Sequence, residues 1–177
     1  RRSVQVDPFY LKASDNEKLE LLYAIAVLFS GLSMNEEAIR YQKTALDIYN
    51  HSSEEVDPSF YNFYLVLQHN LRESGNYEEA LEYGKESLAF SERIDDKTAK
   101  VESCKSIADS LMALMRYDEA ESYLKRSVEI IDAREEELSL SDSYVYGSIG
   151  ELYMNKGDYQ QAYVYTQKAI DIRIKHL

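Results

Sequence analysis

A four-residue pattern ending in alanine recurs four times along this 177-residue chain. The copies are NEEA at 35–38, YEEA at 77–80, YDEA at 117–120 and YQQA at 159–162, and their alanines lie 42, 40 and 42 residues apart. A fixed period of about 20 to 50 residues is typical of arrays in which each unit buries its apolar face against the next one. The period therefore predicts a repeat architecture.

Apolar residues surround each alanine at helical spacing. The positions 16, 13, 12 and 9 residues before the alanine hold Leu22, Ile25, Ala26 and Phe29, then Tyr64, Leu67, Gln68 and Leu71, then Cys104, Ile107, Ala108 and Leu111, then Tyr146, Ile149, Gly150 and Tyr153. A small and an aliphatic residue follow seven and eight positions after it, as in Ala45 and Leu46. Short turn-like segments separate the two runs, such as Ser74-Gly75-Asn76. Each unit is thus predicted to be helix, tight turn, helix.

The last unit carries the fullest pattern, with Tyr146, Ile149, Gly150 and Tyr153 followed by Gly157-Asp158-Tyr159, Ala162 and Ala169. This pattern resembles the tetratricopeptide repeat, or TPR, over residues 19 to 177. The usual TPR period is about 34 residues. The longer period, a second helix expected over 117–137 and a helix start signal at 56–59 are similar to the kinesin-light-chain class of these repeats.

The resemblance implies an all-α fold, a right-handed α-solenoid of four TPR helix-turn-helix pairs. We expect the repeats at about 19–60, 61–100, 101–142 and 143–177, after a helical lead-in at 1–18, in a segment of a larger protein. Small residues should lie where two helix backbones approach closely. Gln68 departs from that pattern, as do Cys104 and Met115, so the second and third repeats are expected to pack less regularly.

The formal charge of −12 disfavours nucleic acid and anionic membrane as partners. No run of about 20 apolar residues predicts a membrane span. The single cysteine, Cys104, cannot form an intramolecular disulfide and is expected to lie in the core. A cytoplasmic protein is the resulting expectation.

No motif for a cofactor, a metal or an enzymatic nucleophile is present in the sequence. The glycines at 147 and 150 fall inside a predicted helix, where they cannot form a phosphate-binding loop. His69 with Glu102 or Asp109 is the only combination that offers acid–base chemistry. We therefore expect neither enzymatic activity nor a bound cofactor.

In TPR arrays the first helices of successive repeats line the concave face, and the resemblance implies that partners bind there. The repeat phase selects the residues that packing leaves free. They are Glu20, Tyr23, Val27, Asn62, Leu65, His69, Arg72, Glu102, Lys105, Asp109, Tyr144 and Glu151. Four of these twelve are acidic, so we do not expect a clamp for a peptide carboxylate of the kind found in chaperone-binding TPR proteins.

The predicted function is non-enzymatic recognition of a protein or peptide through this groove. Residues 19–60, 61–100 and 101–142 carry −5, −3 and −6 charges, which favours a partner with basic residues. The alternative is a peptide-sensing regulatory domain of a larger, for example bacterial, signalling or transcription regulator. The final helix has more apolar residues than one packing face needs, which predicts either further repeats or association with a second copy.

Overall fold

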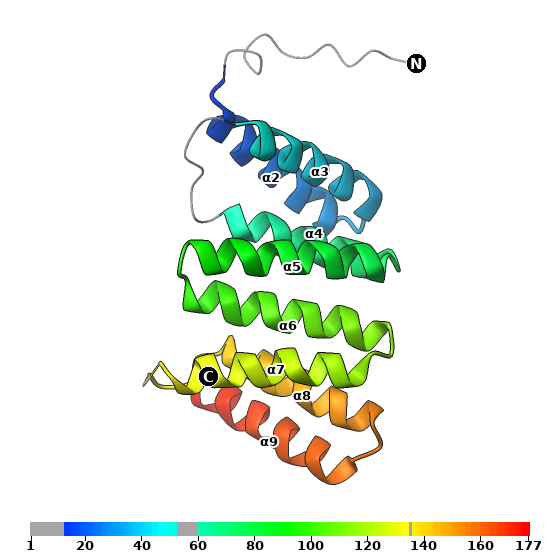
Figure 1. Cartoon of the computed structure of the whole chain (residues 1–177), viewed down its shortest axis with the longest axis vertical. Helices are drawn as coiled ribbons and strands as arrows, with labels where there is room; N and C mark the ends of the chain where they lie inside the picture. The colour runs from blue at the N-terminus through cyan, green and yellow to red at the C-terminus, as the bar shows by residue number, and fades with distance from the viewer. Residues whose placement is uncertain (1–12, 53–59, 135) are drawn as a thin grey trace.

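The computed structural model describes residues 13–52, 60–134 and 136–177. These residues form helices and no strand, which confirms the predicted all-α fold. The helices are α2 (Asp15–Gly31), α3 (Asn35–His51), α4 (Tyr61–Glu73), α5 (Tyr77–Arg93), α6 (Lys97–Ala113), α7 (Tyr117–Asp132), α8 (Asp142–Asn155) and α9 (Tyr159–Lys175). Consecutive helices pair and the pairs stack along one direction (Figure 1). None of the described helices is both long and apolar enough to cross a membrane.

Two helix bounds differ from the sequence prediction. The second helix of the third repeat ends at Asp132 and not at residue 137. Beyond it the Asp142 carboxylate accepts hydrogen bonds from the Arg134 guanidinium and the Ser139 backbone N–H, and these bonds hold the chain in a loop that leads into α8. Helix α2 begins at Asp15, inside the expected lead-in, because Ser14 and Glu17 form a reciprocal capping box. The start signal at 56–59 and residues 1–12 lie outside the described residues.

The turn inside each repeat contains one residue with a left-handed backbone, always five positions before the anchor alanine. The φ angles at Ser33, Gly75, Met115 and Gly157 are 57°, 76°, 57° and 78°. Glycine adopts this conformation without steric cost, whereas a side chain crowds the backbone. The third repeat thus keeps the turn geometry although methionine replaces the glycine.

Small residues lie at the closest helix approaches, as predicted. Ala26, Ala38, Ala108 and Ala120 have no exposed surface, and Ala162 is 1% exposed. Gly150 is buried against α9, where an added Cβ would lie 2.5 Å from Thr166 Oγ1 and 3.3 Å from the Ala162 carbonyl oxygen. The contact between α8 and α9 therefore has no room for a side chain at position 150.

The second repeat accommodates Gln68 by an exchange of sizes. Gln68 is fully buried on α4, and the residue facing it on α5 is Gly84. A Cβ on Gly84 would lie 2.9 Å from Gln68 Oε1 and 2.8 Å from Ile107 Cγ1. At the equivalent positions the third repeat has Ala108 and Leu124, with the small residue on the first helix. The glycine on α5 thus makes room for the glutamine on α4, whose Oε1 is buried with no hydrogen-bond partner among the described residues.

Candidate functional site

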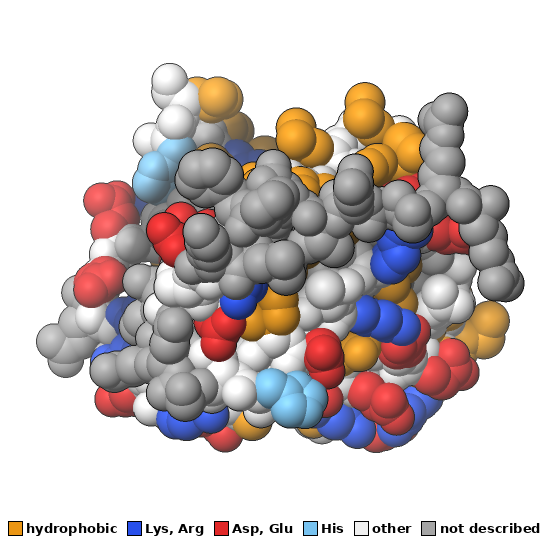
Figure 2. Space-filling model, turned by 90° about the horizontal axis from the view of Figure 1, so that it is seen from above, with side chains coloured by type: hydrophobic (Ala, Val, Ile, Leu, Met, Phe, Trp, Pro, Cys, Tyr) orange, Lys and Arg blue, Asp and Glu red, His pale blue; other side chains and the backbone are white. Residues whose placement is uncertain are grey.

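The first helices of neighbouring repeats, α2, α4, α6 and α8, contact one another along the stack. All twelve residues that the repeat phase selects lie on these four helices. Seen end-on, hydrophobic side chains gather along one edge of the molecule, and acidic and basic side chains lie along the opposite edge (Figure 2). At this end of the molecule the two edges therefore differ in chemistry.

One side-chain hydrogen bond joins each neighbouring pair of first helices. Ser30 Oγ donates to Asn70 Oδ1 at 2.7 Å, Arg72 Nη1 donates to Ser106 Oγ at 2.8 Å, and Ser148 Oγ donates to Asp109 Oδ1 at 3.0 Å. Two of the predicted groove residues, Arg72 and Asp109, thus hold neighbouring repeats together. These bonds fix the spacing of the surface that a partner would meet.

The larger of two adjacent hollows opens between α6 and α8, with a volume of about 380 Å³. Four predicted groove residues line it, namely Lys105, Asp109, Tyr144 and Glu151. Lys105 Nζ lies 2.7 Å from Asp109 Oδ2, so this cation and this anion neutralise each other. Glu151 is exposed, and no ion pair joins it to another described residue. The charged groups of this hollow outside that pair are Glu151 on α8 and Arg173, which reaches in from α9.

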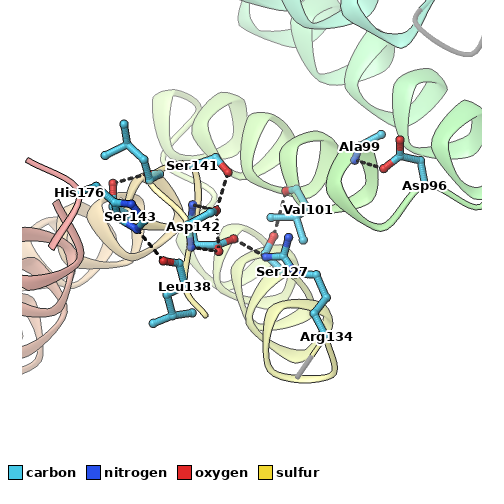
Figure 3. A network of polar contacts seen from close by, with 12 residues as sticks. Asp96, Ala99, Val101, Ser127, Arg134, Leu138, Ser141, Asp142, Ser143 and His176 are labelled. Carbon is cyan, nitrogen blue, oxygen red and sulfur yellow. Dashed lines mark hydrogen bonds and ion pairs between the residues drawn. The ribbon is translucent and has the colours of Figure 1, made fainter. Parts of the chain in front are cut away.

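The smaller hollow, of about 210 Å³, is also lined by α6 and α8 and shares Lys105 and Tyr144 with the larger one. Glu102 also lines it, with Val101 and Val145 as apolar walls. The Arg134–Asp142 ion pair borders it, with only 12% and 3% of the two side chains exposed. Figure 3 shows Asp142 between Arg134 and the residues of the loop before α8. The ion pair gives the hollow a fixed rim.

Arg173 is a site residue that the sequence reasoning missed. Its guanidinium carbon lies 4.9 Å from the centre of the Tyr144 ring, and its Nε donates to Ser143 Oγ at 3.1 Å. It reaches from α9 across Gly147, where an added Cβ would lie 4.0 Å from Arg173 Nη2. Its only sign in the sequence was Gly147, which has no side chain at a repeat position where the other repeats have Tyr23, Leu65 and Lys105.

Glu102 and Cys104 show how burial acts on ionisable groups of α6. Desolvation raises the pKa of Glu102, Lys105 opposes that shift, and Asp142 and Asp96 add to it. Burial likewise raises the pKa of the Cys104 thiol to about 11, which keeps it protonated at neutral pH. Cys104 has no exposed surface, so the structure confirms its prediction as a core residue.

His69 is exposed on α4. The oxygens of Asp109 accept hydrogen bonds from Lys105 and Ser148, and no hydrogen bond joins His69 to Asp109 or Glu102 among the described residues. Among all residues that the structure describes, no group of His, Cys, Asp and Glu has the arrangement of a metal site. The acid–base pair suggested by the sequence is not formed.

The structure brings five of the twelve predicted residues together around the two hollows: Glu102, Lys105, Asp109, Tyr144 and Glu151. The residues predicted on α2 and α4 do not line these hollows. Tyr23, for example, packs against Phe63 with ring centres 4.9 Å apart. The candidate site is thus the α6–α8 end of the predicted groove.

This arrangement defines a helical repeat protein with a hollowed first-helix surface. Two family models described as tetratricopeptide repeat match residues 69–94 and 143–174. No curated protein matches the sequence. With the repeat phase and the helix pairing already described, these matches show tetratricopeptide repeats within residues 69–94 and 143–174.

Solved structures with the same fold include the apo form of RapI, at 21% identity and a TM-score of 0.80 over 93% of this chain and 58% of RapI. TPR-like repeats of a kinesin-light-chain candidate from Podosopora anserina give 18% identity and a TM-score of 0.75, covering 93% of this chain and 79% of that one. A Rap protein complexed with Competence and Sporulation Factor gives 18% and 0.75, covering 90% and 44%. The chain spans less than two thirds of the length of the two Rap proteins.

Proposed function

We propose that this protein is a non-enzymatic recognition module that binds a peptide or an extended protein segment along the α6–α8 groove. The observation that carries the proposal is the pair of adjoining hollows that share Lys105 and Tyr144. A row of small hollows along parallel helices suits successive side chains of an extended chain better than one compact ligand. The cytoplasm is the setting we propose, since the single buried thiol offers no disulfide.

The partner we propose carries basic residues. The chain has a net charge of −12, and Glu102 and Glu151 border the hollows without an ion pair to any described residue. Complementary charge speeds association and weakens as salt rises. An affinity that stays constant between low and high salt would argue against a basic partner.

A regulatory domain of a larger signalling protein is our second candidate. One structure with this fold is a Rap protein in complex with Competence and Sporulation Factor. By analogy, this array would receive a regulatory factor and act as the sensor of a larger signalling protein.

Selection of peptides from a random display library on the immobilised chain would test the groove. We expect selected peptides to lose binding to a variant with Tyr144→Ala and Glu151→Ala, both exposed residues of the larger hollow. The matched control carries Tyr159→Ala and Glu119→Ala, exposed residues of the second helices α9 and α7. Circular dichroism should show that both variants keep their helices. Equal loss in the two variants, or none in either, would move the site away from the α6–α8 groove.

A further inference from the structure

The smaller hollow contains a carboxylate that forms no ion pair within the described part of the chain. Glu102 lines it, and no hydrogen bond or ion pair joins its carboxylate to another described residue. The two cations that line the hollow form ion pairs with other acids, Lys105 with Asp109 at 2.7 Å and Arg134 with Asp142. The hollow therefore has one anion in excess once these pairs are counted.

The walls of the hollow suit the rest of a basic side chain. Val101 and Val145 form the apolar floor of the hollow, with only 4% and 1% of their surfaces exposed, and the end of the methylene stem of lysine or arginine would contact them there. Tyr144 contributes an aromatic ring, a favourable neighbour for a guanidinium or ammonium group. Arg173 already stacks on this ring, but it lines only the larger hollow. The volume of about 210 Å³ is below the range of about 300–1,000 Å³ of small-molecule sites and suits a single side chain.

The cost of leaving Glu102 unpaired also favours an external cation. Partial burial penalises its charged form, which is why its pKa lies above the ordinary value, although Lys105 acts in the opposite direction. A basic group that enters the hollow would replace lost hydration with a charge-assisted hydrogen bond. No cation of the described residues forms this contact with Glu102, because Lys105 is paired with Asp109 and Arg134 with Asp142.

We propose that the hollow of Glu102, Tyr144, Val101 and Val145 is a specificity pocket for one arginine or lysine side chain of the bound peptide. The pocket rests on the proposed function, since it selects a residue of the segment that the groove binds. Glu102 receives the charged group and Tyr144 covers it. The two valines contact the stem.

Titration of the ¹⁵N-labelled chain with N-acetyl-arginine amide, followed by NMR, tests the pocket directly. N-acetyl-citrulline amide is the matched neutral probe. We expect the arginine probe to shift amide signals of residues 98–105 and 141–145, and the citrulline probe to leave them unchanged. Glu102→Gln should raise the Kd of the arginine probe by about tenfold. Glu82→Gln, an exposed acid on the second helix α5, should leave the Kd unchanged.

Equal shifts with both probes, or an unchanged Kd in Glu102→Gln, would overturn the pocket. Peptide selection separates this failure from failure of the groove. Selected peptides with no basic residue in common that still depend on Tyr144 and Glu151 would refute the pocket and leave the proposed function standing. A fixed arginine or lysine in the selected peptides that disappears when Glu102→Gln is the target would support the pocket.

Discussion

At the scale of single residues, the turn inside each repeat gives the clearest energetic consequence. Met115 has a φ of 57° and a side chain that is 76% exposed, so it has the strain of the left-handed backbone and gains little from packing. The steric penalty of about 1–2 kcal/mol exceeds the extra entropy that glycine loses on folding, about 0.5–1 kcal/mol. We expect Met115→Gly to stabilise the protein by about 0.5–1 kcal/mol in urea unfolding.

The reverse change at the equivalent position is its control. Gly157 has a φ of 78° and nothing within 4 Å of an added Cβ, so Gly157→Ala tests backbone strain alone. We expect it to destabilise the protein by about 1 kcal/mol. If both substitutions changed the unfolding free energy in the same direction, the left-handed conformation would not be the cause.

The burial of single residues could be predicted from the sequence at positions where the repeat pattern places the same contact in every unit. The buried alanines follow directly from the period, because the same contact recurs in every unit. The compensation of Gln68 by Gly84 and the reach of Arg173 over Gly147 could not be predicted in this way. Both are contacts between different helices that exist in one repeat only, and a periodic pattern carries no information about such exceptions.

At the scale of helix pairs, Gly150 sets how closely α8 approaches α9. A methyl group there meets Thr166 Oγ1 and the Ala162 carbonyl oxygen, and the backbone oxygen cannot rotate away. We expect Gly150→Ala to cost about 1–3 kcal/mol of unfolding free energy. Gly31→Ala is the matched control, because it lies at the end of α2 with nothing within 4 Å of the new atom. That substitution should be neutral or stabilising by up to about 1 kcal/mol.

A carboxylate between α7 and α8 makes the stability of this junction sensitive to acid. Glu121 lies 2.7 Å from Lys125 Nζ and 2.8 Å from Lys156 Nζ, and these hydrogen bonds, Lys125 first, lower its pKa to about 2. The folded pKa lies below the ordinary value of 4.5, so the stabilisation is complete above pH 4.5. It is lost as the pH falls from there towards 2.

Glu121→Gln should therefore cost about 1 kcal/mol at neutral pH and almost nothing near pH 2. Thermal unfolding between pH 2 and 7 measures the difference. Glu82→Gln supplies the control, since Glu82 is exposed on α5 and forms no ion pair with another described residue. A constant difference between Glu121→Gln and the parent protein over this range would contradict the assigned role of the two lysines.

At the scale of the whole molecule, architecture was easier to predict than the site. Four helix pairs follow from the period alone, whereas the position of the hollows depends on how α6 and α8 are spaced. Ser148 sets that spacing through Asp109, and the Asp142–Arg134 pair fixes the loop at one end. The phase places the twelve candidate residues on the first helices, and side-chain contacts between repeats determine where hollows form on those helices.

The last helix has an exposed apolar face at positions that the first two repeats bury. Leu46 and Leu88 are 6% and 7% exposed, because the following first helix covers them, whereas Ile170 at the same repeat position is 42% exposed. Four residues later α9 has Ile174, which is 62% exposed, where the earlier repeats have Asn50, Glu92 and Asp132. No described helix covers this face of α9, so further repeats or a second copy remain the two proposed occupants.

We expect the 177-residue chain on its own to associate through this face at high concentration, since exposed apolar surface favours contact. Sedimentation equilibrium should then show masses above 20.5 kDa that increase with concentration. Ile170→Lys with Ile174→Lys should restore the monomer mass, and Asn50→Lys, at the matching exposed position of α3, should not. A monomer mass at every concentration would show that α9 does not recruit a second copy, and would leave a further helix as the proposed occupant.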